Sequence, residues 1–452
     1  MPSSRPPYER PSAVARSGLR RDWRWLGVAL CFLLGLTAWG VTTITVDRTP
    51  IVVGLLHSQS GPLAGVERAT LEAEILAIEQ LNNQGGLLGR PVKYVIADGA
   101  TDAFMFAREA ERLIRGEHAC VLFGGSTTDF RREVVPVVEA ANHLLVYPHA
   151  YEGLEQSPNV VYTGPLPNQQ MPAAVHWCMS KRSARSFFLI GGDSATARCV
   201  SAIVSDQLVG LGAEQVGNAH LGATDDVEAT VREIADRKPD VILTTLSGAP
   251  GIALLRALRG ASIGLPETAV VHWAIAPETL DTLPRDDMVD TFVVTTTMEH
   301  VGNAPEPAEQ GARLQSSVGS APSPAVGESS AFHNCPSIAL WAQAVREAGT
   351  TDPVRVRQSL IHQGLGTPHG IITVDPLTQH TWLAVSIARV TAAGGLEPVW
   401  WTGKQAQRPV PFPISRSREV WEQLVADTFR PHQGTAAAAP SPFDSERGAR
   451  LP

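Results

Sequence analysis

Short apolar runs alternate with longer segments of helical spacing between residues 51 and 297. The predicted strands are 51–56, 92–97, 119–123, 144–147, 187–191, 241–245, 269–273 and 290–297, and the predicted helices are 63–83, 103–115, 131–142, 195–211, 227–236 and 252–259. Short strands that alternate with helices build a parallel sheet covered by helices on both faces, so the pattern predicts an α/β protein. The series restarts near residue 187, which indicates two lobes.

The pattern is weaker after residue 297. Residues 302–327 are rich in Pro, Ser and Ala and predict a loop beside a weak helix. The later predicted elements are a helix at 336–349, strands at 370–373 and 383–390, and a short helix at 420–429. Residues 435–452 consist mainly of Ala, Pro, Ser and charged residues, which predicts a disordered tail.

The N-terminus has the pattern of an export signal. Trp25–Val46 contains no charged residue, and about 20 apolar residues are enough to cross a bilayer as a helix. The preceding residues 1–24 are rich in arginine, which predicts that they stay in the cytoplasm while the rest of the chain is exported to the periplasmic side. Two interpretations stay open: an uncleaved signal anchor that tethers the chain to the membrane, or a signal peptide cut after Gly40.

Charge and cysteine spacing exclude two classes of partner. The formal net charge is −8 at pH 7, whereas binding of nucleic acid requires clustered Lys and Arg. The cysteines show no CxxC spacing, so we expect no metal site. Cys120 lies in a predicted strand and is expected to pack as a small apolar residue. A disulfide between Cys178 and Cys199 is an option for an exported protein.

Motifs of common enzymes are missing from the sequence. There is no Gly-x-Ser-x-Gly elbow, no phosphate loop of the Gly-x-x-x-x-Gly-Lys type, no His-Glu-x-x-His and no dinucleotide-binding glycine pattern after a strand. His57, Asp98, Ser126 and His149 are residue types that hydrolases use, but they lie in none of these contexts. We therefore predict a protein that is not an enzyme and has no cofactor.

The segment 144–159 carries the clearest sign of function. An apolar run ends at Pro148, and a turn follows that is dense in aromatic and hydrogen-bonding groups. In open α/β sheets, ligands bind outside the carboxyl ends of the strands. The residues Tyr-Glu-Gly-x-Glu-Gln-Ser-Pro-Asn at 151–159, followed by Tyr-x-Gly and Pro-Asn-Gln, resemble the urea and short-chain-amide branch of the type I periplasmic solute-binding proteins.

The resemblance extends over about residues 50–403. Its further motifs are at 54–61, 77–90, 123–125, 131–139, 189–193, 238–242 and 375–380. It implies a two-lobed type I periplasmic-binding-protein fold in which each lobe is a parallel sheet flanked by helices. The expected division is 50–167 with 298–365 for lobe 1, 168–297 with 366–403 for lobe 2, and a largely disordered tail at 404–452.

The resemblance also implies a ligand site between the lobes. First-lobe contacts would be Ser126, Thr128, Tyr147, His149 and Tyr151, and second-lobe contacts would be Asp193, Ser194 and Thr196. Each residue type also has a structural alternative. Thr128 and Asp193 could be helix N-caps, Tyr147 could be core, and His149 could be a solvated loop residue. Glu152 and Glu155 could brace the loop.

Several positions differ from the family pattern. Ser126, Ser194 and Thr196 stand where the family has aromatic rings, and Ser247 stands where it often has Asn. Loss of rings removes apolar contacts, so the ligand would be larger or more polar than urea, or binding would be lost. We expect an exported, membrane-tethered binding protein that delivers its ligand to a separately encoded ABC permease. The alternatives are a ligand-sensing regulator with a separate output partner and a vestigial binder.

Overall fold

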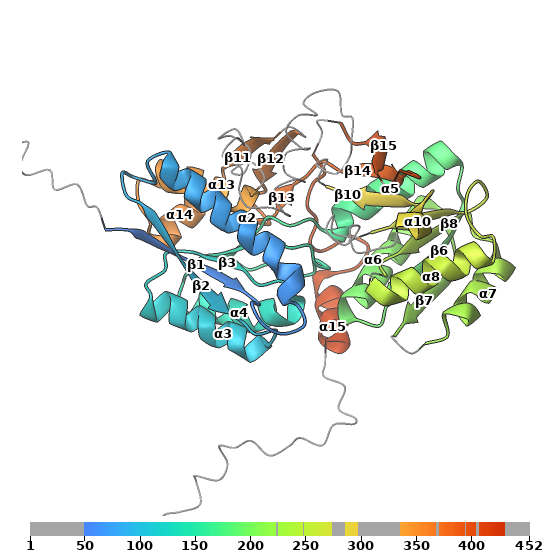
Figure 1. The fold of residues 1–452 in the computed structure, drawn as a ribbon, viewed down its shortest axis with the longest axis horizontal. Coiled ribbons are helices and arrows are strands. Elements are labelled where there is room, and N and C mark those ends of the chain that lie inside the picture. Colours follow the sequence, from blue (N-terminus) through green and yellow to red (C-terminus); the bar gives the residue numbers. More distant parts are fainter. Residues whose placement is uncertain are drawn as a thin grey trace, which may run out of the picture. The chain divides into compact units, whose positions relative to one another are not determined.

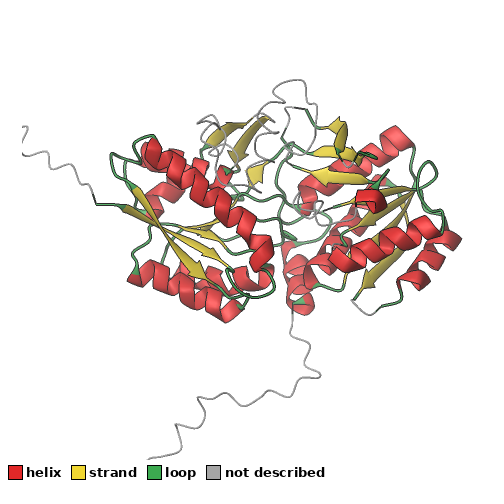
Figure 2. Ribbon diagram, in the orientation of Figure 1, coloured by secondary structure: helices red, strands yellow, loops and turns green. Residues whose placement is uncertain are grey.

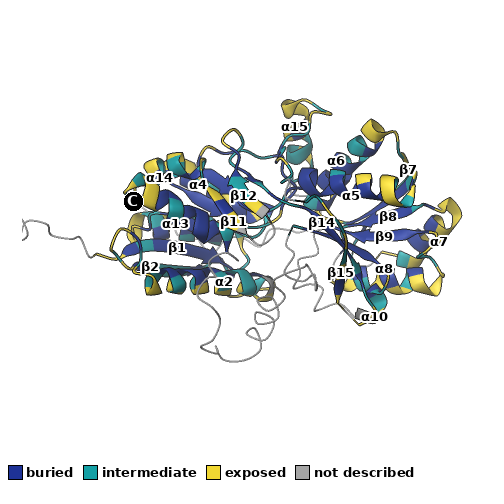
Figure 3. Cartoon of the chain, turned by 90° about the horizontal axis from the view of Figure 1, so that it is seen from above, coloured by how far each residue is buried: buried dark blue, intermediate teal, exposed yellow. Residues whose placement is uncertain are grey.

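The computed structural model describes residues 49–222, 225–246, 248–273, 285–296, 335–367, 370–393, 395–403 and 406–429. It contains two large sheets, each covered by helices on both faces (Figures 1 and 2). Buried residues concentrate on the strands and on the helix faces that cover them (Figure 3). The two-lobed α/β architecture predicted from the alternation of apolar runs is confirmed.

The first sheet has five parallel strands in the order β2-β1-β3-β4-β5. They are β1 (Ile51–His57), β2 (Val92–Asp98), β3 (Leu122–Gly124), β4 (Leu145–Tyr147) and β5 (Val160–Tyr162). The helices of this lobe are α2 (Ala64–Asn83), α3 (Ala103–Glu111, continued by the π-helical turn Arg112–Gly116), α4 (Thr128–Ala140), α13 (Pro336–Ala348) and α14 (Pro353–Leu360). One apolar core joins the sheet to α2, α13 and α14, and another joins it to α3 and α4.

The second sheet has seven strands in the order β15-β14-β10-β9-β8-β6-β7. The parallel strands are β6 (Ser186–Gly192), β7 (Glu214–Leu221), β8 (Val241–Thr244), β9 (Ala269–His272) and β10 (Phe292–Thr295), and the antiparallel ones are β14 (Ser386–Val390) and β15 (Leu396–Trp401). Its helices are α5 (Pro167–Arg182), α6 (Ala195–Leu211), α7 (Val227–Arg237), α8 (Gly248–Gly260) and α10 (Arg285–Met288). Helices α5 and α6 cover one face, and α7, α8 and α10 cover the other.

A small antiparallel sheet packs with the first core. It consists of β11 (Gly364–Thr367), β12 (Gly370–Val374) and β13 (Thr381–Trp382). Leu365 and Val374 are buried in the core that contains α2 and α13. The boundary expected at residue 366 therefore falls inside a hairpin that packs on the first lobe.

The C-terminal segment 406–429 is folded, which corrects the prediction of a largely disordered tail from residue 404. The predicted short helix is confirmed as α15 (Arg418–Thr428), which lies against α6 (Figure 1). Trp421 is fully buried in a cluster with Leu154 and Ile203. Arg416 holds Asp206 of α6 through two hydrogen bonds of 2.8 Å. These apolar and ionic contacts hold a segment in which the hydrophobic pattern gave only one short helix.

The disulfide between Cys178 and Cys199, which the sequence left open, is not formed. Cys178 and Cys199 are both free and buried. Cys178 faces the core between α5 and the second sheet, whereas Cys199 faces the cluster around Trp421, so the two thiols belong to different packing layers. Cys120 is free and partly buried against the first core, as expected for a small apolar residue.

Within the described part of the chain, none of the helices combines the length and apolar character that a membrane crossing requires. The predicted span at 25–46 lies outside these residues, as do the basic segment 1–24, Ser247, the loop 302–327 and the end of the chain from 430.

Candidate ligand-binding site

Residues from both lobes meet at a cavity of about 250 Å³ beside the carboxyl ends of the strands of the second sheet. Tyr151 comes from the loop after β4, while Thr245 and Trp273 follow β8 and β9. The hydroxyl of Thr245 is buried and has no hydrogen-bond partner among the described residues. The complete lining is Ala150, Tyr151, Gly192, Ser194, Thr196, Ala197, Leu221, Thr245, Leu246, Pro250 and Trp273. Polar groups aimed at an aromatic-walled cavity are typical of small-ligand sites.

His149 lies next to this lining and is neutral at pH 7. Its ring is 6.1 Å from the ring of His57 and 5.7 Å from that of Tyr147, measured between centroids. Burial, reinforced by the positive charge of His57, lowers the pKa of His149 to about 4. Its Nε2 atom is buried and unpartnered within the described ranges. A neutral imidazole can donate or accept one hydrogen bond through this atom.

His57, at the end of β1, holds two buried carboxylates of α2. Its Nε2 lies 2.8 Å from Glu74, and its Nδ1 lies 3.5 Å from Glu67. Burial alone would lower the pKa of His57, but the two carboxylates outweigh it and raise the pKa to about 9. His57 is therefore protonated at pH 7. Glu67 also accepts a 2.5 Å hydrogen bond from the hydroxyl of Ser126, so this predicted ligand contact is already engaged.

The charge of His57 predicts a loss of stability at alkaline pH. Because its folded pKa is about 9 and its ordinary value is 6.5, its contribution is complete below pH 6.5 and disappears as the pH rises through 9. We expect the free energy of unfolding in guanidinium chloride to fall by roughly 3 kcal/mol from this group between pH 6.5 and 9.5. His57→Gln should show a clearly smaller fall. Equal falls in the two proteins would contradict a protonated His57.

Arg131 of α4 is completely buried and is the centre of a second network. Its Nε donates to Glu155 at 2.8 Å, and its Nη2 donates to Glu152 at 3.3 Å. The guanidinium lies 4.1 Å from the ring centroid of Tyr151 and 4.8 Å from that of Tyr147. Burial disfavours the charge, but the carboxylates keep the pKa of Arg131 well above its ordinary value.

The carboxylate of Glu152 connects the two lobes. Its Oε2 accepts hydrogen bonds from Thr128 of α4 at 2.6 Å and from Thr196 of α6 at 3.3 Å. Burial raises the pKa of Glu152, whereas Arg131 and Thr128 act against this shift. Because donors reach both carboxyl oxygens, the contacts fit the ionised form of Glu152. Glu152 does more than brace its loop.

The helix caps differ from the alternatives considered from sequence. Thr127 is the N-cap of α4 and accepts from the amide of Phe130 at 3.3 Å, so Thr128 is the first helical residue. Ser194 is the N-cap of α6 and accepts from the amide of Ala197 at 3.2 Å. Asp193 is exposed and pairs with Arg198, which leaves its carboxylate outside the cavity lining.

Three of the eight predicted site residues belong to the cavity lining, and the other five do not. Tyr151, Ser194 and Thr196 line the cavity. Tyr147 is completely buried, and its ring contacts those of His149 and Tyr151, so it is a core residue as well as a neighbour of the site. Sequence reasoning missed the roles of Arg131, Thr245 and Trp273. The last two end the predicted strands 241–245 and 269–273, and a position at the carboxyl end of a strand could have marked them.

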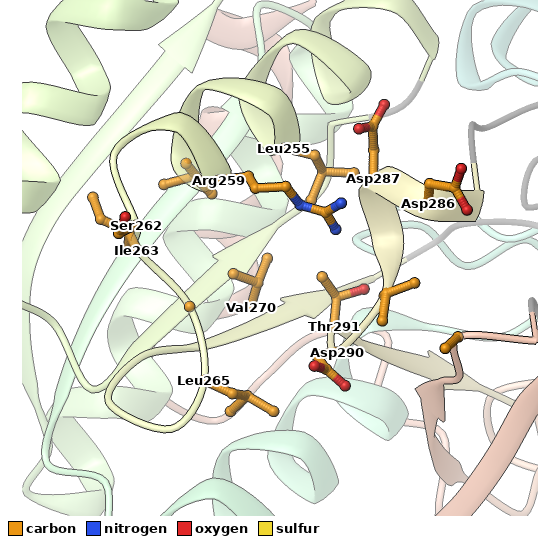
Figure 4. A pocket seen from close by; sticks show the side chains of 14 residues that line it. Leu255, Arg259, Ser262, Ile263, Leu265, Val270, Asp286, Asp287, Asp290 and Thr291 are labelled. Atoms are coloured by element: carbon orange, nitrogen blue, oxygen red, sulfur yellow. The ribbon is translucent and has the colours of Figure 1, made fainter.

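A larger cavity of about 600 Å³ lies at the opposite edge of the second sheet, where β9 and β10 begin (Figure 4). Arg259 extends into it from α8. Two of its carboxylates are already paired outside it, Asp287 with Arg256 at 2.7 Å and Asp290 with Arg389 at 2.6 Å. Ligands of open α/β folds bind at the carboxyl ends of the strands, so the smaller cavity is the better candidate.

The protein has two α/β lobes and a polar cavity with aromatic walls at the carboxyl ends of one sheet. These features place it in the class of two-lobed binding folds. Residues 51–418 match the family model described as periplasmic binding protein domain, and the chain belongs to this family. Helix α15 begins where this match ends.

Solved structures share the fold at low sequence identity. An amino acid ABC transporter substrate-binding protein from Pseudomonas fluorescens Pf-5 is 16% identical with a TM-score of 0.68, covering 81% of this chain and 97% of that one. A branched-chain amino acid transporter substrate-binding protein from Streptococcus pneumoniae, in complex with isoleucine, is 17% identical (TM-score 0.63, coverage 78% and 99%). An ABC transporter solute-binding protein from R. palustris, in complex with 4-hydroxybenzoate, is 18% identical (TM-score 0.64, coverage 79% and 98%).

Proposed function

We propose that the chain is an exported solute-binding protein that closes its two lobes on a small polar ligand and delivers it to a separately encoded ABC permease. The observation that carries the proposal is the cavity where Tyr151 of the first lobe faces Thr245 and Trp273 of the second. A ligand held from two lobes stabilises the closed arrangement of a hinged protein. The apolar run Trp25–Val46 would keep the protein at the membrane.

The ligand that we favour is urea, a short-chain amide or a larger relative of these. Such a molecule offers carbonyl acceptors and N–H donors. The hydroxyls of Ser194 and Thr245 can both donate and accept. Thr196 can accept while it donates to Glu152, and neutral His149 lies nearby. The rings of Tyr151 and Trp273 supply apolar walls despite the ring losses noted from sequence. The amino acids and aromatic acid named for solved relatives support a small solute, though of other chemistry.

Thermal melting of the full-length chain in mild detergent tests this function. Ligand binding to the native state must raise the melting temperature with ligand concentration. The panel comprises urea, formamide, acetamide, larger amides, amino acids and polyamines. We expect a graded shift with an amide. No shift with any member of the panel would contradict the transport function.

Thr245→Val separates binding from folding. The hydroxyl of Thr245 is buried without a partner in the described part of the protein, so replacing it by a methyl group should leave the unliganded protein as stable or slightly more stable. Loss of one hydrogen bond to the ligand should weaken binding about 5- to 10-fold. Ser205→Ala is the matched control and should leave affinity unchanged. The hydroxyl of Ser205, on α6, donates to the backbone carbonyl of Ser201 of the same helix and has no other partner among the described residues. Unchanged affinity in Thr245→Val would remove Thr245 from the site.

A further inference from the structure

Three donors from both lobes converge on the buried carboxylate of Glu152. Thr128 and Thr196 donate to one oxygen at 2.6 and 3.3 Å, and Arg131 donates to the other at 3.3 Å. Glu152 is 1% exposed and Arg131 is completely buried. Hydroxyls combined with a guanidinium are the groups with which proteins recognise a carboxylate.

Two helices also begin beside this carboxylate. Thr128 is the first residue of α4, and Thr196 is the second residue of α6. The amino end of a helix carries partial positive charge and favours an anion. Nη1 of Arg131 has no partner among the described residues, so the guanidinium retains an unused donor. The helix ends, the two hydroxyls and the buried cation together form an anion site.

We propose that Glu152 permanently fills the anion subsite of the ligand cavity, so that the cavity rejects ligands with a free carboxylate and accepts neutral or cationic polar ligands. This inference rests on the proposed function. The groups that would hold a ligand carboxylate are occupied by the protein's own. Tyr151, the neighbour of Glu152 in sequence, lines the cavity, and so does Thr196, its hydrogen-bond donor. A ligand carboxylate bound there would stand close to Glu152 and would be repelled.

The charge balance of the two buried first-lobe networks acts in the same direction. Among the described residues, these networks contain four carboxylates, from Glu67, Glu74, Glu152 and Glu155, and two cations, from His57 and Arg131. The excess of negative charge beside the cavity disfavours anionic ligands. Neutral amides and amines do not meet this repulsion.

Chemical rescue of Glu152→Ala tests the subsite directly. The truncation leaves Arg131 and two hydroxyls around an empty space of carboxylate shape. We expect full-length Glu152→Ala to melt at a lower temperature than the wild type, and formate or acetate to restore melting in a concentration-dependent way. Neither salt should shift the wild type beyond the effect of equal chloride.

Glu139→Ala is the matched control for the rescue. Glu139 of α4 accepts a 2.6 Å hydrogen bond from Ser157, which lies in the same loop as Glu152. No guanidinium reaches Glu139 in the described structure. Acetate should therefore not rescue Glu139→Ala. Absence of rescue of Glu152→Ala by acetate and formate, or equal rescue of both variants by acetate, would overturn the anion subsite.

Ligand pairs of matched shape keep the inference testable if Glu152→Ala does not fold. In the wild type, a neutral amide such as 4-hydroxybenzamide or acetamide should bind at least 10-fold more tightly than 4-hydroxybenzoate or acetate. Glu152→Gln keeps the shape and removes the charge, so it should reduce this ratio to about 3-fold or less. A wild type that binds the carboxylate as tightly as the amide would overturn the inference and leave the proposed function standing. Rescue of Glu152→Ala by acetate in a protein that binds no ligand would uphold the subsite and refute the proposed function.

Discussion

Replacement of Arg131 by alanine is expected to lower the free energy of unfolding by about 3–5 kcal/mol, because removing one partner of a buried ion pair leaves uncompensated charge. Glu152 and Glu155 would both lose their cation, and Glu152 is almost completely inaccessible to water. The rings of Tyr147 and Tyr151 would also lose the guanidinium that packs on them. Denaturation by guanidinium chloride at pH 7 measures the effect.

Arg132→Ala is the control for this prediction. Arg132 is the next residue of α4, is exposed, and contacts the ring of Phe429 at 5.2 Å. A surface cation of this kind contributes less than about 1 kcal/mol. Similar losses of unfolding free energy in the two variants would mean that the buried network around Arg131 does not stabilise the fold.

Trp341→Ala should have a comparable effect, about 3–5 kcal/mol, as is usual when a large core ring is truncated. Trp341 of α13 is completely buried and packs edge-to-face on Phe123 of β3, with 5.7 Å between ring centroids. Helix α13 comes after the second-lobe strand β10 in sequence, but it packs in the core of the first lobe. The cavity left by the ring would therefore weaken the first lobe.

Trp401→Ala provides the matched comparison. Trp401 ends β15 at the edge of the second sheet and is 44% exposed. Its loss should lower the free energy of unfolding by less than about 1 kcal/mol. If Trp341→Ala were as mild as Trp401→Ala, then α13 would not be an integral part of the first core.

The alternation of apolar runs was sufficient to predict most of the fold because parallel strands buried on both faces consist of continuous apolar residues. The helix predicted at 195–211 coincides with α6. Helix α5 was missed because it is buried over most of its length and shows no amphipathic period. Strand β7, with the sequence Glu-Gln-Val-Gly-Asn-Ala-His-Leu, was missed because an edge strand needs little apolar surface.

The site was only partly predictable from sequence. Hydroxyls at 126, 128, 194 and 196 were predicted because the resemblance to the family carries its ligand contacts onto these positions. Their partners could not, since Thr128 and Thr196 are 68 positions apart in sequence and meet only through Glu152. Burial of Arg131 is equally a tertiary property, because an arginine in a helix is ordinarily exposed.

Equilibrium binding of the best ligand from the melting panel, measured by calorimetry on the full-length chain and two variants, tests the central claim most directly. His149→Ala changes the first lobe, and Thr245→Val changes the second. A ligand held from both lobes predicts one site per chain, an affinity reduced about 5- to 10-fold in Thr245→Val, and a loss at least as large in His149→Ala. Absence of binding, or an affinity that only one of the two variants reduces, would contradict a site formed by both lobes.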